Sequence, residues 1–309
     1  DQTAGVLVFS GGTTTGSIVY GTIVETNAGT ADANDIIIGE AAGANSTGAA
    51  KVTFTGAMTT GADIFVHGTG DSTIILGNGT NGITGALPIT FGSDGNMGAN
   101  TLTLSAGTVV LSGALNVAAV AGDAGSSLTI NMAANSTISG AISDTADATL
   151  VTINVDGSAT LGSGANAVID LGDTTSANVE IDNAAVLTLA GTGAITLDSF
   201  DIAGTTGEIN VTGAKTITAA IDADSGDGVN GILDVDASTT FAGVIGGDNA
   251  LLKMEVAQSA VMTLSQDITV TTVEMTGNAS ELKFTGANKT LTGNITAAAD
   301  GNGILNIDN

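Results

Sequence analysis

The stretch "INVTGAKTITAAI", residues 209 to 221, decides the fold, because its pattern of apolar residues recurs elsewhere in the chain. Apolar residues stand at offsets 0, 2, 8 and 12, and the same offsets are apolar in "LDVDASTTFAGVI" (233 to 245) and "INMAANSTISGAI" (130 to 142). Two longer copies, at 102 to 115 and 282 to 295, insert one residue at the turn. Such alternation is typical of strands with one buried face.

Further copies give the repeat a period. Weaker ones begin at Ile153, Val179 and Met254, and the last starts at Leu305. From Ile130 to Leu305 the starts lie on average 25 residues apart. Short strands and turns repeated with a period of this length indicate a repeat architecture.

We therefore predict an all-β fold, a single right-handed parallel β-solenoid with coils of about 25 residues. It would span residues 1–309 as one domain, less regular over 1–100 and clearly repetitive over 101–309. The predicted inward columns include Ile130, Met132, Ile209, Val211, Leu233, Val235, Leu282 and Phe284. A pair of β-sandwiches is the alternative, since sandwiches also have short strands separated by frequent turns.

Composition favours the same fold class. The 309 residues include 45 glycines, one proline and no cysteine, and aromatic residues make up only 3% although 43% are hydrophobic. A core of small aliphatic side chains suits stacked strands. Frequent glycines leave little room for helices, because each interior glycine costs about 1 kcal/mol relative to alanine.

Charge limits the partners. The chain has five lysines, no arginine and 31 acidic residues, which gives a net charge of -26. This charge repels phosphate backbones and anionic lipids, so we expect neither nucleic acid binding nor membrane insertion. No stretch approaches 18 uninterrupted apolar residues, the length typical of a membrane-spanning helix.

No residue set predicts catalysis. His67 is the only histidine, and Asp71 and Ser72 follow it closely, but a strand and a turn would spread them over opposite faces. Paired carboxylates could suit glycoside hydrolysis, but the aromatic platforms that bind sugars are lacking. We predict that the protein is not an enzyme, with no catalytic and no cofactor-binding residues.

The turn "DADSGDG" (222 to 228) is the best candidate for a calcium site, with Asp222, Asp224 and Asp227 as ligands. Compared with the EF-hand loop, the third acid is displaced by one residue, and Leu233 stands where a bidentate Glu is required. Solvated turn acids are the alternative reading. A structural calcium ion is the only cofactor for which the sequence offers ligands.

The two ends of the repeat carry apolar residues and no polar capping coil. Stable monomeric solenoids are closed by atypical coils at both tips. We expect either that the chain is a segment of a larger protein or that subunits complete one another's ends. In the second case the interface would comprise Val6, Leu7, Val8 and Phe9 at one end and Ile304, Leu305 and Ile307 at the other.

The stretches "LTLSAGTVVLSGALNV" (102 to 117) and "LKFTGANKTLTGNI" (282 to 295) resemble the strand repeats of autotransporter passenger domains and related bacterial surface adhesins. The resemblance extends over most of the chain from residue 100 onward and is compositional. It implies a secreted β-helix with an adhesive or layer-forming role. The C-terminal translocator barrel of those families is not part of this sequence.

These observations predict a non-enzymatic, extracellular structural protein of the cell surface. Its partners would be copies of itself, stacked head-to-tail into a filament or a surface layer. The alternative is a monomeric adhesin passenger fragment, which would hold a host ligand or a surface glycan with a lateral loop at 77 to 98.

Overall fold

The structure is a computed structural model that describes residues 7–9, 17–19, 23–24, 36–39, 49–56, 58–59, 63–77, 83–85, 88–92, 95, 97–118, 126–144, 150–172, 176–224, 230–297 and 303–308. All the regular secondary structure in these ranges is β-strand, as the frequent glycines predict. No described segment forms a helix that is long and apolar enough to cross a membrane.

The chain divides into two compact units. Unit 1 comprises Asp1–Asn154 and Asp170–Ala177, and unit 2 comprises Val155–Ile169 and Asn178–Asn309. Both units are parallel β-solenoids, which confirms the predicted fold class. The sandwich alternative is wrong, because every strand pair with a described register is parallel. The single domain over 1–309 stays a prediction.

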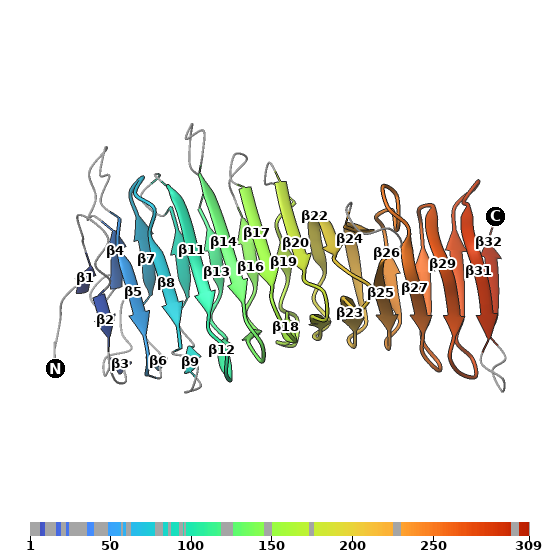
Figure 1. The fold of residues 1–309 in the computed structure, drawn as a ribbon, viewed down its shortest axis with the longest axis horizontal. Helices are drawn as coiled ribbons and strands as arrows, with labels where there is room; N and C mark the ends of the chain where they lie inside the picture. Colours follow the sequence, from blue (N-terminus) through green and yellow to red (C-terminus); the bar gives the residue numbers. More distant parts are fainter. Residues whose placement is uncertain are drawn as a thin grey trace. The chain divides into compact units, whose positions relative to one another are not determined.

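Unit 1 consists of three stacks of short strands, and each coil contributes one strand to each stack (Figure 1). The first stack contains β1 (Leu7–Phe9), β4 (Ile36–Gly39), β7 (Ile64–His67), β10 (Ile89–Phe91), β13 (Leu115–Val117) and β16 (Ile142–Asp144). The second contains β2 (Ser17–Val19), β5 (Lys51–Phe54), β8 (Thr73–Leu76), β11 (Ala99–Leu104), β14 (Ser127–Met132) and most of β17 (Leu150–Val155). The third contains β3 (Ile23–Val24), β6 (Met58–Thr59), β9 (Ile83–Gly85), β12 (Val109–Leu111) and β15 (Thr137–Ile138). Unit 1 also contains Asp170 of β19 (Ile169–Asp170) and the first two residues of β20 (Ser176–Ile181).

Unit 2 has the same plan with longer strands, some of which run around a corner. Its first stack contains β22 (Ile195–Ile202), β24 (Lys215–Ala223), β26 (Thr239–Phe241), β28 (Val261–Leu264), β30 (Glu281–Thr285) and β32 (Ile304–Asp308). Another contains β18 (Ala159–Leu161), β21 (Val186–Leu189), β23 (Glu208–Val211), β25 (Asn230–Val235), β27 (Leu251–Val256), β29 (Ile268–Met275) and β31 (Leu291–Ala297). The third side is formed by β20 (Ser176–Ile181) with the second halves of β22 and β24.

Strand register gives the length of each coil. In the first stack of unit 1, paired residues lie 25 to 29 positions apart along the sequence. Their column consists of Leu7, Ile36, Ile64, Ile89, Leu115 and Ile142. In unit 2 the distance is 20 to 24 positions, along Ile195, Ile217, Phe241, Leu264, Phe284 and Ile307. Along these columns the coils of unit 1 are therefore longer than those of unit 2, which are shorter than the predicted 25 residues.

The core consists of the alternate residues that point inward from each strand. All the predicted inward residues are buried: Ile130, Met132, Ile209, Val211, Leu233, Val235, Leu282 and Phe284. The largest fully buried side chains are Phe54, Phe91, Phe200 and Phe241. A parallel pair places like positions over one another, so these side chains form lengthwise columns, and their burial supplies the main favourable term in folding.

The predicted alignment of repeats is correct for neighbouring coils and wrong between distant ones. Ile209 pairs with Leu233, and Ile217 with Phe241, as the shared offsets require. Ile130, however, belongs to the second stack of unit 1, where it pairs with Leu102.

The long steps between predicted repeat starts have the same origin. Val179 pairs with Phe200, 21 residues on, although the next predicted start is Ile209. Met254 pairs with Val273, whereas the next predicted start, Leu282, lies in the other stack, next to Met262. All three sides of a coil carry the same alternation, so the pattern identifies a strand without identifying its side.

Candidate functional site

The last described coil of unit 2 leaves an apolar edge uncovered. In β32, Leu305 pairs with Leu282 and Ile307 pairs with Phe284, so both residues continue columns that are buried in β30. Their exposed fractions are nevertheless 50% for Leu305 and 63% for Ile307, and that of Ile304 is 47%. The column positions of the core are therefore present in this strand, but nothing in the described chain lies over them.

A second strand belongs to the same edge. Among the described strands, β31 is the last in its sheet, and its described partner is β29. Ile295, at the middle of β31, is another exposed large apolar side chain. We call Ile295, Ile304, Leu305 and Ile307 the apolar edge. Besides apolar surface, an outer strand presents backbone N–H and C=O groups that can pair with a further strand.

A cavity of about 280 Å³ opens into the apolar edge. Its lining combines core side chains, the turn after β30 and the exposed side chains of β32: Phe284, Gly286, Asn288, Lys289, Leu291, Leu305 and Ile307. The cavity is thus mostly apolar, with one ammonium group at its wall. It is the size of one or two apolar side chains and too small for a drug-sized ligand.

Three of the seven predicted interface residues are therefore exposed as expected, namely Ile304, Leu305 and Ile307. At the other end of the chain, Val6 lies outside the described residues. Leu7, Val8 and Phe9 form β1, which pairs with β4 in the first stack of unit 1, and Phe9 is half-buried. Their role in an interface stays a prediction.

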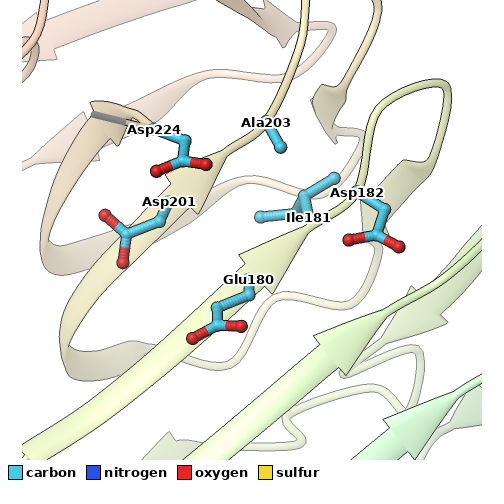
Figure 2. Close-up of a pocket in the computed structure, with 6 residues that line it drawn as sticks. All are labelled: Glu180, Ile181, Asp182, Asp201, Ala203 and Asp224. Carbon is cyan, nitrogen blue, oxygen red and sulfur yellow. The ribbon is translucent and has the colours of Figure 1, made fainter. Parts of the chain in front are cut away.

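A second hollow of unit 2 is acidic. Its volume is about 270 Å³, and its lining comprises Glu180, Ile181, Asp182, Asp201, Ala203 and Asp224. Figure 2 shows the four carboxylates around the side chains of Ile181 and Ala203. Strand register explains the gathering, because Glu180 pairs with Asp201 on the neighbouring strand. Carboxylates of successive coils are thereby stacked at the spacing of paired strands, roughly 4.8 Å.

The pKa of Asp201 is raised above its ordinary value. Burial is the main cause, and the carboxylates of Asp222, Asp224 and Asp248 add to it. The hydroxyl of Ser199 opposes the rise, since it donates a hydrogen bond of 2.8 Å to Oδ2 of Asp201. The hollow can therefore attract cations or take up protons, but no cationic side chain lines it.

The predicted calcium ligands are only partly brought together. Asp224 lines the acidic hollow, while Oδ1 of Asp222 accepts a hydrogen bond of 3.0 Å from the backbone N–H of Asp248. Asp227 lies outside the described residues. Within the described ranges, no three Asp, Glu or His side chains are arranged to hold a metal ion. Calcium binding at this turn stays a prediction.

The only histidine is not joined to its neighbours in a catalytic arrangement. Oδ1 of Asp71 accepts a bond from the backbone N–H of Ala99, and the hydroxyl of Ser72 accepts one from that of Ala50. His67 lies half-buried on β7 beside Phe65. The side chains that could form a triad are thus bound to the backbone of neighbouring coils. Whether the protein is an enzyme is left open by this finding.

One group of charged residues was missed by the sequence analysis. On the outer side of unit 2, Asp234, Glu255 and Glu274 pair in register on three successive strands. Lys253 lies among them and forms ion pairs with both glutamates. The repeat alignment already placed Asn210 beside Asp234, so a reading of the polar positions along with the apolar ones would have found the column as far as Glu255.

Comparisons with known protein families, with curated proteins and with solved structures find no match to this chain. The likeness to bacterial surface repeats therefore rests on the quoted stretches alone.

Proposed function

We propose that the chain is a non-enzymatic structural subunit that stacks head-to-tail on copies of itself, through the apolar edge, into an extracellular filament or surface layer. The observation that carries the proposal is the exposure of Leu305 and Ile307 at positions that are buried one coil earlier. A coil of like shape laid on the edge would bury both side chains and pair the free backbone groups.

A second copy of the chain is a suitable occupant for a geometric reason. The described strands pair with their neighbours in parallel register, so a coil of this chain has the shape that the edge would accept. Contact between two different surfaces of identical subunits is heterologous, and it extends into a filament when the symmetry does not close.

Charge at the edge also favours stacking. The acidic column of β25, β27 and β29 ends with Glu274, whose partner on β31 is the uncharged Thr296. In β32, the outward residue Asn306 pairs with Lys283 and donates a hydrogen bond to Glu281. A subunit of net charge -26 can approach more easily where strand residues such as Thr296 and Asn306 carry no charge.

The test is electron microscopy and sedimentation of the purified chain, compared with the double variant Leu305→Asp, Ile307→Asp. We expect fibres or sheets of the unaltered chain and single particles of the variant, because two carboxylates would have to be buried at the junction. Leu150→Asp is the matched control, since Leu150 is an exposed apolar residue of unit 1 that lies outside the edge. The control should assemble normally.

Two outcomes would contradict the proposal. One is a chain that remains monomeric at all concentrations and salt levels, which would favour the monomeric adhesin instead. The other is assembly of the double variant at the same concentration as the unaltered chain, which would place the contact elsewhere.

A further inference from the structure

A continuous polar column runs along the outer side of unit 2. Its members pair in register on seven successive strands: Thr160, Thr188, Asn210, Asp234, Glu255, Glu274 and Thr296. The three acids are consecutive, so their carboxylates are held at the spacing of paired strands, roughly 4.8 Å. Like charges directly opposite one another on a sheet are destabilising.

Lys253, a cation within this column's surroundings, is already bound. Nζ of Lys253 forms one ion pair with Glu255 and another, of 2.6 Å, with Glu274. Both partners raise the pKa of Lys253, so it stays charged. Asp234 forms no ion pair within the described chain, although Lys253 lies on the neighbouring strand.

Other acids surround Asp234. Glu208 lies on the preceding strand, two residues before Asn210, and Asp236 follows two residues later along the chain. Burial raises the pKa of Asp234 to about 6, and the carboxylates of these two residues and of Glu255 contribute in the same direction. Lys253 opposes the shift without cancelling it. Because Asp234 has no ion-pair partner among the described residues, this carboxylate is most easily neutralised by binding a proton.

The residue paired with Asp234 on the other side offers a place for that proton. Asn210 pairs with Asp234 in register, and both side chains point outward from their strands. Oδ1 of Asn210 is buried and accepts no hydrogen bond in the described chain. A buried acceptor without a donor is costly, and an ionised carboxylate cannot satisfy it because it has no hydrogen to donate.

We propose that Asp234 is a proton-binding site of the solenoid surface, which takes up one proton in mildly acidic surroundings and donates it in a hydrogen bond to Oδ1 of Asn210. Protonation removes one of the stacked charges and satisfies the buried acceptor at the same time. Unit 2 is therefore a more stable solenoid under mild acid than at neutral pH. This inference is independent of self-assembly, because both residues belong to one chain.

The direction of the pH dependence follows from linkage. The pKa of Asp234 is about 6 in the folded chain and near 3.8 in the unfolded one, so the folded state binds the proton more tightly. The stabilisation that proton binding gives to the folded state is fully present below pH 3.8, the pKa in the unfolded chain, and is lost as the pH rises through about 6. Because Asp234 is half-exposed, solvent screening reduces the effect, and we expect about a tenfold change in the folding equilibrium constant.

The experiment compares urea unfolding at pH 5 and pH 7 for the unaltered chain and for Asp234→Asn. When the pH is lowered from 7 to 5, the folding equilibrium should shift towards the folded state about threefold to fivefold more in the unaltered chain than in the variant, since solvent screening reduces the full effect of about tenfold over this interval. Asp170→Asn removes an exposed strand carboxylate outside the column, and it should behave as the unaltered chain does. Equal pH dependence of the chain and of Asp234→Asn would overturn the proposal.

A second measurement needs no variant, and it remains decisive if Asp234→Asn fails to fold. Carbon NMR of the side-chain carboxyl of Asp234 and the side-chain carbonyl of Asn210 should show both signals moving with one midpoint near pH 6. A midpoint near pH 4 for Asp234 would overturn the proposal. So would an Asn210 signal that does not follow the Asp234 titration, because the shared hydrogen bond would then be absent.

Discussion

Lys215 shows how strongly the pKa of a side chain depends on which face of the strand the side chain occupies. It is the first residue of β24, at an inward position, and only 9% of its surface is exposed. Its Nζ donates a hydrogen bond of 2.7 Å to the carbonyl of Ala190, and it forms no ion pair within the described chain. Burial of the ammonium group lowers the pKa of Lys215 to about 8.

This burial predicts that Lys215→Met stabilises the chain at neutral pH. The pKa of Lys215 is 10.5 in the unfolded chain and about 8 in the folded one, so the folded state binds the proton more weakly. The destabilisation by the buried charge is therefore fully present below pH 8 and disappears as the pH rises to 10.5. We expect a gain of about 1 kcal/mol in the free energy of unfolding at pH 7. Urea unfolding at pH 7 and pH 10.5 measures it.

The gain should disappear at the higher pH. Lys51→Met is the matched control, because Lys51 is an exposed lysine at the start of a strand. It should change the stability little at either pH. A gain for Lys215→Met that is the same at both pH values would mean that better packing, and not the buried charge, is responsible.

At the scale of the element, the corners between strands depend on stacked glycines. Gly162, Gly191 and Gly213 occupy one corner of successive coils in unit 2. A Cβ atom on Gly191 would overlap with the carbonyl oxygen of Gly162, and one on Gly213 would overlap with that of Gly191. The coils approach so closely here that the corner has no space for a side chain. Glycine is needed for close approach as well as for its backbone freedom.

We predict that Gly213→Ala costs about 3 kcal/mol of unfolding free energy, because the backbone of one coil must move away from its neighbour. Gly286→Ala is the contrasting variant. Gly286 has a φ of +90°, but its Cβ would meet only the end of Lys289 at 3.7 Å, so the cost should be about 1 kcal/mol from backbone strain alone. Denaturant unfolding of both variants measures the difference. Equal losses would show that steric contact between coils contributes nothing.

At the scale of the whole molecule, net charge opposes the proposed assembly. A charge of -26 on each subunit repels the next one, and this repulsion is screened over about 30 Å at 0.01 M salt and about 3 Å at 1 M. We therefore predict that the lowest protein concentration that gives fibres falls about tenfold between 0.02 M and 0.5 M sodium chloride. Light scattering across a dilution series measures it. An unchanged threshold would contradict the prediction.

Calcium dependence is a separate question about the same assembly. If calcium at Asp222, Asp224 and Asp227 holds subunits together, a chelator should dissolve fibres at constant ionic strength. Fibres that persist in the chelator would remove that role for calcium. Salt and chelator distinguish general screening from binding at a particular turn, because sodium chloride screens all charges and the chelator removes only the divalent ion.

Strand character, the inward residues and the stacking of coils can be inferred from the amino-acid sequence without the fold. These follow from local alternation and from repetition, both of which are visible in stretches such as 209 to 221 and 233 to 245. The exposed apolar residues Leu305 and Ile307 could also be predicted, since the repeat places them in a core column.

The side of the coil to which each strand belongs is visible only in the folded chain, because all sides share one alternation. The fold therefore decides the register of polar residues as well. The step of the polar column from Glu255 to Glu274, and the acidic hollow that places Asp224 beside Asp201, arise from pairing across coils of unequal length. Electrostatic effects depend on distances of a few ångströms between such neighbours, and these are set by the stacking of the coils.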